Sequence, residues 1–175
     1  MLPQMFQRAR GRRSGNIASR FFRTLRPQNR SPEYYERTGN ADALMLIYRP
    51  IQPSDYEAVR GFLADNGWAA RVSNDKRFRA MMNSADRTVV AIDGSRVVGF
   101  ARALCDGVSN GYILMLAVAK DLRRQGIGRQ LVEQLMLEDT DEITWVLRAG
   151  RDSRGFWQRL GFVASDIATE RVRRD

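Results

Sequence analysis

Two glycines and three arginines stand together where an apolar run gives way to a helical pattern. Gly126 and Gly128 open the helical pattern, and Arg123, Arg124 and Arg129 surround them. The free amides of a first helical turn point outward, and the helix dipole favours negative charge there. Glycine lacks a side chain that would keep phosphate oxygens from the backbone. The segment therefore predicts an anion site suited to phosphate groups.

The spacing of these glycines excludes two other phosphate motifs. A dinucleotide-binding fingerprint would need a third glycine at position 131, which is Leu131, and the Gly-Lys-Ser/Thr of a Walker loop is absent. The remaining pattern, Arg-x-x-Gly-x-Gly, is short, and a glycine pair at a helix start often serves only close packing. Phosphate binding and close packing both remain open from this loop alone.

The composition excludes several kinds of chemistry. The 175 residues contain no histidine, and Cys105 is the only cysteine, so disulfides, Ser-His and Cys-His pairs and nearly all zinc sites are excluded. We therefore predict no metal. Arg, Asp or Gly interrupts each apolar run before the roughly 20 residues of a membrane span. The expectation is a protein of a reducing, cytoplasmic compartment that does not enter the membrane.

The net charge of +9 belongs mainly to the N-terminal part of the chain. Residues 1–45 carry nine arginines and three acids, a net charge of +6, and residues 46–175 carry only +3. Such a mildly basic body suits a small polyanionic ligand. A nucleic-acid partner is not needed to explain the charge.

Residues 1–44 are rich in arginine, with scattered apolar residues, and do not resemble a core. Three interpretations compete: a disordered basic extension, a mitochondrial-type presequence, or sequence upstream of a natural start at Met45. The third is favoured, because periodic structure begins abruptly at Met45. We therefore predict two regions, a basic extension over residues 1–44 and one folded domain over residues 45–175.

The first elements of this domain are a strand and two helices. A strand is predicted over residues 44–48, followed by a helix from Ser54. The form Ser54-x-x-Glu57 predicts a capping box, and Gly67 ends the helix. A second short helix after Ser73 is predicted to turn apolar residues toward the core, namely Phe78, Met81 and Met82.

The middle and end of the chain predict a sheet with further helices. Strands over residues 88–92 and 97–104 flank an Asp-Gly turn, so they should pair antiparallel. The apolar runs 112–119 and 143–147 predict buried strands. A helix opens near Gly126 and buries Ile127, Leu131, Val132 and Leu135. A helix over residues 153–160 and closing strands over 162–164 and 167–172 complete the order.

At this point the sequence resembles the GNAT superfamily of N-acetyltransferases. Arg123, Gly126 and Gly128 match the family pattern Q/R-x-x-G-x-G/A. The run 116–118 is similar to its central strand, and residues 156–162 are similar to its late helix and Gly-Phe strand entry. The resemblance spans residues 45–172. It implies an α/β (α+β) fold with a mixed, mostly antiparallel central sheet flanked by helices, and a V-shaped split between two central parallel strands.

The resemblance also implies where acetyl-CoA lies, in the split between the strand ending at Val118 and the strand 143–147. Backbone groups of Leu116 and Val118 would bond the pantetheine arm like an added strand. The amide of Leu116 or Ala117 would polarise the thioester carbonyl. The pyrophosphate would be held by amides of one loop, namely Arg124, Gln125, Gly126, Ile127, Gly128 and Arg129.

The implied reaction is direct attack of an amine on the thioester, and here the sequence departs from better-known members. Tyr112 occupies the position that often carries a catalytic glutamate, and Trp157 the position that often carries a tyrosine acid. Trp157 would pack against the pantetheine or the core. Asp106 and Tyr112 are the ionisable groups nearest to the expected acetyl site, and Asp106 is the candidate base, although capping of its own loop is the favoured explanation. Cys105 is expected to be a packing residue.

The implied function is transfer of the acetyl group of acetyl-CoA to a primary amine, by a monomer or a homodimer. The missing glutamate and tyrosine keep a second hypothesis open, that the domain binds acyl-CoA as a sensor without turnover. The acceptor would be set by the first helices and by loops around residues 68–77 and 106–110.

Overall fold

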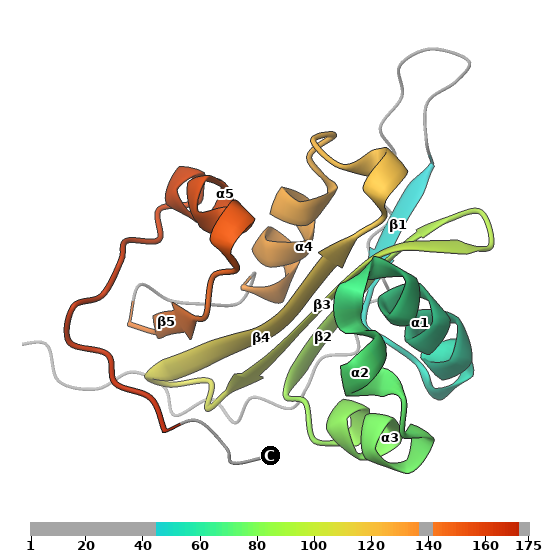
Figure 1. Ribbon diagram of the computed structural model, residues 1–175, viewed down its shortest axis with the longest axis horizontal. Helices are drawn as coiled ribbons and strands as arrows, with labels where there is room; N and C mark the ends of the chain where they lie inside the picture. The colour runs from blue at the N-terminus through green and yellow to red at the C-terminus, as the bar shows by residue number, and fades with distance from the viewer. Residues whose placement is uncertain (1–44, 137–141, 172–175) are drawn as a thin grey trace, which may run out of the picture. The chain divides into compact units, whose positions relative to one another are not determined.

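The computed structural model describes residues 45–136 and 142–171, and these residues form a five-stranded sheet with helices on both of its faces (Figure 1). The predicted extension 1–44 lies outside the described residues. The strands are β1 (Leu46–Arg49), β2 (Arg87–Asp93), β3 (Arg96–Cys105), β4 (Asn110–Val118) and β5 (Thr144–Leu147). The α-helices are α1 (Tyr56–Leu63), α2 (Ala69–Val72), α3 (Asp75–Asn83), α4 (Ile127–Leu135) and α5 (Arg154–Arg159).

The sheet has the mixed topology that the sequence predicted. The strands lie in the order of the sequence, antiparallel from β1 to β4, whereas β4 and β5 are parallel. Asp93 pairs with Arg96 across a two-residue turn, in which Gly94 adopts a φ of 56°. The parallel pair needs a crossover, and α4 supplies it. The predicted α/β class with a mostly antiparallel sheet is confirmed.

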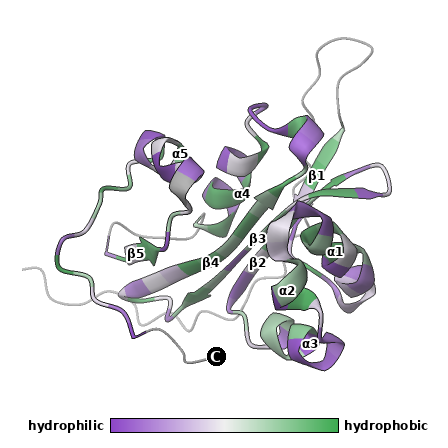
Figure 2. Cartoon of the chain, viewed as in Figure 1, coloured by the Kyte–Doolittle hydropathy of each residue, from purple (hydrophilic) through white to green (hydrophobic). Residues whose placement is uncertain are grey.

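Alternate residues of β3 face opposite layers of helices. Gly99 faces α4 so closely that an added Cβ would lie 2.8 Å from Leu131 and 3.2 Å from Ile127. Its neighbour Phe100 is fully buried on the other face, which α1 covers. Figure 2 shows the apolar residues concentrated along the central strands. The core thus lies in two layers, one on each side of β3.

The first helix begins differently from the prediction. The predicted cap at Ser54 and Glu57 is wrong: Asp55 accepts from the main-chain N–H of Gln52 at 2.7 Å, and Glu57 accepts from Arg79 at 2.6 Å. Asp55 is held in place by the Arg49 guanidinium, which also lowers the pKa of the Asp55 carboxyl.

Gly67 interrupts the helical path as predicted. It adopts a φ of +93°, which breaks the helical path after α1. The chain then forms the additional short helix α2, which the sequence analysis did not predict, before α3. In α3, Phe78 and Met82 are buried and Met81 packs against the core, as predicted.

The burial of β4 and β5 corrects the predictions for these strands. Buried and half-buried residues alternate along β4, and β5 alternates half-buried with exposed residues. Val146 is 47% exposed, because β5 has only β4 as a neighbour in the described part of the chain. An apolar run predicts burial on both faces only where neighbours cover the strand.

The closing strands are also corrected. Residues 162–171 form no strand, and Val163 and Ile167 are each 88% exposed. β-branched residues favour a strand only when an adjacent edge pairs with their backbone, and no such pairing occurs here. Val172 lies outside the described residues.

Candidate cofactor and active site

The strand β4 has a partner on its β5 side over only its first half. Asn110 pairs with Thr144 and Ile113 with Leu147, and there the parallel register ends. Among the described residues, the second half of β4, from Leu114 to Val118, has no strand beside it on this side (Figure 1). A strand edge of this kind can pair with an extended ligand through main-chain hydrogen bonds.

A bulge in β4 lies at the end of the paired half. Ile113 pairs with Ala103 and Met115 with Arg102, so Leu114 is an extra residue without a partner in β3. A bulge reverses which side chains face each helix layer and is frequent beside active sites. Tyr112 therefore faces the α1 layer with its partner Leu104, and Leu116 faces the α4 layer with Ala101.

The loop after β4 turns sharply into α4. A short 3-10 helix, η3 (Lys120–Leu122), is followed by left-handed backbone at Arg124, with a φ of 65°, and at Gly126, with a φ of 88°. The Arg123 side chain donates from Nε to the Val118 carbonyl at 3.3 Å and ties the loop to the end of β4. The loop thus has a defined path over the end of the strand.

The main-chain amides of this loop have no partner among the described residues. The first amide of α4 that donates within the main chain is that of Gln130, to the Gly126 carbonyl at 3.0 Å. In residues 45–136 and 142–171 no amide from Arg124 to Arg129 donates to a protein oxygen. Arg124, Gln125 and Gly126 are exposed. Unpaired amides at a helix start form an anion site.

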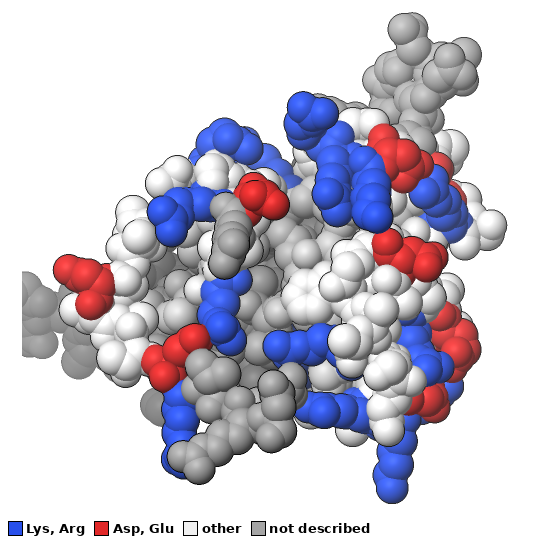
Figure 3. Space-filling model, in the orientation of Figure 1, with Lys and Arg blue, Asp and Glu red and all other residues white. Residues whose placement is uncertain are grey.

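Positive charge gathers over this loop, where Figure 3 shows several lysine and arginine side chains side by side. The acids just before and just after this loop in the sequence are already paired: Asp121 with Arg96 at 2.8 and 3.0 Å, and Glu133 with Arg129 at 2.7 Å. The hydrogen bonds from Arg96 lower the pKa of Asp121. Arg123 and Arg124 are exposed cations beside the free amides.

The two glycines of the motif serve different purposes in the structure. Gly126 has open space around it, and its positive φ is the reason that glycine is needed. Gly128 faces α5 instead: an added Cβ would lie 3.4 Å from the ring of Phe156 and 3.5 Å from Val118. The close-packing interpretation therefore applies to Gly128.

Trp157 belongs to the hydrophobic core. It is 7% exposed and contacts Phe156 and Phe162 edge to face, with ring centroids 5.0 and 5.3 Å apart. The sequence predicted that Trp157 packs against either the pantetheine or the core, and in the structure it packs in the core.

Asp106 anchors the turn between β3 and β4. Its carboxylate accepts from the main-chain amides of Val108, Ser109 and Asn110 at 2.8–3.0 Å, and from the Ser109 hydroxyl at 2.8 Å. These bonds hold the pKa of Asp106 far below its usual range. A carboxylate of such low basicity is a poor proton acceptor, so the structure favours loop capping over the role of base.

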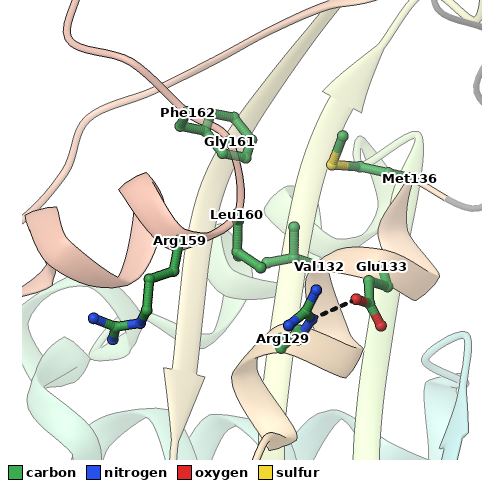
Figure 4. A pocket seen from close by; sticks show the side chains of 8 residues that line it. All are labelled: Arg129, Val132, Glu133, Met136, Arg159, Leu160, Gly161 and Phe162. Carbon is green, nitrogen blue, oxygen red and sulfur yellow. Dashed lines mark hydrogen bonds and ion pairs between the residues drawn. The ribbon is translucent and has the colours of Figure 1, made fainter.

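A cavity of about 530 Å³ lies between α4 and the end of α5 (Figure 4). Of the predicted cofactor-binding residues, Arg129 lines this cavity and the others do not. Arg129 turns toward Glu133 across its wall. The remaining lining residues are Val132, Met136, Arg159, Leu160, Gly161 and Phe162.

Arg102 is a candidate site residue that the sequence analysis missed. It is 7% exposed and lies between Thr88 and Met115 in the sheet. The sequence does set Arg102 apart, because it is the only charged residue in the apolar run 97–104. Buried charges are normally paired, so a buried arginine without an ion pair among the described residues is a candidate for binding an anion.

Comparison with known proteins supports the same assignment as the motif. The family model described as acetyltransferase (GNAT) domain matches residues 52–173. No curated protein matches the sequence.

Solved structures share the fold at low identity. A GNAT family acetyltransferase from Streptococcus pneumoniae TIGR4 is 22% identical, with a TM-score of 0.60 over 76% of this chain and 98% of that one. The aminoglycoside N-acetyltransferase AAC(6')-Iy in complex with CoA is 17% identical, with a TM-score of 0.60 over 78% and 99%.

Glucosamine-6-phosphate N-acetyltransferase from Arabidopsis thaliana is 16% identical, with a TM-score of 0.56 over 73% of this chain and 97% of that one. The TM-scores of these three structures show a common fold, and their low identities show no more than that. The family model covers most of the chain. The split strand pair, the free amides before α4 and this match agree, and the chain belongs to the GNAT family of acetyltransferases.

Proposed function

We propose that this protein transfers the acetyl group of acetyl-CoA to a primary amine. The observation that carries the proposal is the row of amides from Arg124 to Arg129, which bond to no described residue and lie directly after the half of β4 that has no described strand on its β5 side. One ligand can use both features when an extended arm lies beside β4 and two linked phosphates bind the helix start. Acetyl-CoA has this shape and charge.

Some residues of the site would bind acetyl-CoA, and one main-chain amide would polarise its thioester carbonyl. The open side of β4, at Leu116 and Val118, would pair with the pantetheine arm. The amide of Leu116 or Ala117 would donate to the thioester oxygen as negative charge develops on it. Arg123, Arg124 and Arg129 would balance the charge of the pyrophosphate, whose oxygens the loop amides bind.

The chemical step would be a direct displacement. The amine lone pair attacks the carbonyl carbon, the carbon–sulfur bond breaks, and the thiolate of CoA leaves and takes up a proton. An alkyl ammonium with a pKa near 10.4 must first lose a proton, at a cost of about 4.6 kcal/mol at pH 7. Tyr112, half-buried on the α1 side of the bulge, is the ionisable group that we propose to take part in this transfer.

The compartment and assembly belong to the same proposal. No helix in the described part of the chain is long and apolar enough to cross a membrane. We propose that the protein acts in the cytoplasm, as a monomer or homodimer, with acetyl-CoA and an amine as partners and with neither a metal nor a nucleic acid.

A catalytically weak acyl-CoA sensor is the second candidate. It is favoured by one observation, that Asp106 is bound within its own turn and is a poor base. Thiol release measured over a broad panel of amines separates the two candidates. The enzyme releases CoA in proportion to acetylated amine, whereas the sensor is stabilised by acetyl-CoA and releases no thiol with any amine.

A further inference from the structure

Arg102 is a buried cation that has no hydrogen-bond partner among the described residues. Its side chain is 7% exposed, and the next inward residues on the same face, Phe100 and Val90, are fully buried. In the part of the chain that the structure describes, the guanidinium donates no hydrogen bond, and its Nε is enclosed without an acceptor. Arginine carries five N–H donors, so this side chain has unused capacity for an anion.

Within residues 45–136 and 142–171, no acid forms an ion pair with this charge. Asp86 is the acid that acts on it, yet Asp86 is exposed and its Oδ2 accepts from the main-chain amide of Cys105 at 3.0 Å. Burial lowers the pKa of Arg102, and the charge of Asp86 opposes this only in part. Buried arginines are normally paired, because an unpaired buried charge loses its hydration. An anion from outside the protein would complete the arrangement.

Arg102 lies on the face of the sheet that α1 covers, which is the side where we expect the amine acceptor to enter. Arg102 faces the α1 layer, opposite to Gly99 and therefore opposite to α4 and the phosphate loop. It pairs with Met115, the residue before Leu116, and lies beside the bulge at Leu114. Tyr112 faces the same layer through its pairing with Leu104. An acceptor that enters between the first helices and β4 would meet Arg102.

We propose that Arg102 binds an anionic group of the amine acceptor, a carboxylate or a phosphate. The inference rests on the proposed function, because it names the class of acceptor for the same site. A planar guanidinium binds two oxygens of either group at once, which fixes the direction of the amine as well as its affinity. The preferred substrates are therefore amines with a negative charge, and polycationic amines such as neamine are poor ones.

The test compares matched acceptors with and without the anion, each at several pH values so that a difference in amine pKa is accounted for. Amino acids are measured against their carboxamides, and glucosamine 6-phosphate against glucosamine, with neamine as the polycation. The full-length protein is compared with Arg102→Met, which removes the charge, and Arg102→Lys, which keeps it without the two-oxygen geometry. Arg171→Met is the control, because Arg171 is an exposed arginine far along the chain from β3. Steady-state rates and melting temperatures are both recorded.

The proposal predicts that one anionic class is acetylated in preference to its neutral partner. Arg102→Met should raise KM for that class about tenfold to a hundredfold, as expected for a lost charged hydrogen bond. Its KM for acetyl-CoA should stay unchanged, and Arg102→Lys should recover part of the preference. The free Arg102→Met protein should melt at a temperature no lower than wild type, because an unpaired buried charge is gone. Arg171→Met should behave as wild type.

Other results would contradict either the anion-binding role of Arg102 or the proposed acetyltransferase activity. Equal KM values for anionic and neutral partners in wild type, or an unchanged preference in Arg102→Met, overturn the role of Arg102. A lower melting temperature with lost acetyl-CoA binding also overturns it, since Arg102 would then support the fold. If no amine is acetylated but anionic amines raise the melting temperature of wild type and not of Arg102→Met, the anion site stands and the proposed enzyme fails.

Discussion

Gly128 of α4 lies in contact range of Phe156 of α5, so that an added Cβ would be 3.4 Å from the ring. This distance is ordinary van der Waals contact, which a methyl group fits and a branched side chain does not. The two helices that flank the open half of β4 therefore meet at a glycine. A branched side chain at this position should therefore change the spacing of α4 and α5, whereas alanine should not.

Replacement of Gly128 is expected to show graded effects. Gly128→Ala should bind acetyl-CoA as wild type does, and its stability should rise by a few tenths of a kcal/mol because alanine is the better helix former. Gly128→Val should displace Phe156 and weaken acetyl-CoA binding about tenfold or more. Calorimetric titration of both variants measures this. Normal binding by Gly128→Val would mean that the spacing of α4 and α5 does not shape the site.

Replacement of Gly126 tests the backbone of the loop. Gly126 has a φ of 88°, so Gly126→Ala should cost about 1 kcal/mol of unfolding free energy and disturb the adjacent amides. Gly61 provides a matched control, because it lies inside α1 with open space and no positive φ. Gly61→Ala should stabilise by about 0.5–1 kcal/mol. Urea unfolding compares the two, and stabilisation by Gly126→Ala would refute the left-handed geometry.

Asp106→Asn should change stability rather than catalysis. The pKa of Asp106 is lowered in the folded protein, so its carboxylate contributes stability above the unfolded pKa of about 3.9. That contribution is lost as the pH falls through the folded pKa. The gap in melting temperature between wild type and Asp106→Asn should be constant near neutral pH and narrow in acid. An altered pH–rate profile in this variant would restore Asp106 as a base.

Gly111→Ala should disturb the pairing of β4 with β5. Gly111 pairs with Trp145, and an added Cβ would overlap the indole ring. The ring also lies under the Arg87 guanidinium, 5.6 Å from its centre, which leaves it little freedom to move. We expect a loss of about 1–3 kcal/mol of unfolding free energy, as for an overpacked core. A variant as stable as wild type would show that β5 can shift away from β4.

Much of the fold could be predicted because local patterns decide it. The Asp-Gly turn fixes the β2–β3 hairpin, Gly67 interrupts the helical path after α1, and the apolar face of α4 is visible at Ile127, Leu131 and Leu135. The loop of the candidate site was visible for the same reason. Its glycines mark a helix start, and the structure leaves the amides there unpaired.

The remaining features depend on neighbours that a single segment does not reveal. Val163 and Ile167 have strand-forming side chains but no paired edge in the described residues. The sequence left Asp106 open as a base or as the cap of its loop, and only the folded turn shows the three amides that its carboxylate binds. Arg102 stands in an apolar run, and its lack of a partner becomes visible only when the sheet and α1 enclose it.

The most direct test of the account is amide NMR of residues 124–129 during titration with acetyl-CoA. S-acetylpantetheine, which has the same thioester arm without the pyrophosphate, serves as the matched ligand. We predict that acetyl-CoA shifts the amide signals of these residues and that S-acetylpantetheine leaves them in place while it shifts those of the second half of β4. If saturating acetyl-CoA leaves the amides of residues 124–129 unmoved, they do not bind its pyrophosphate.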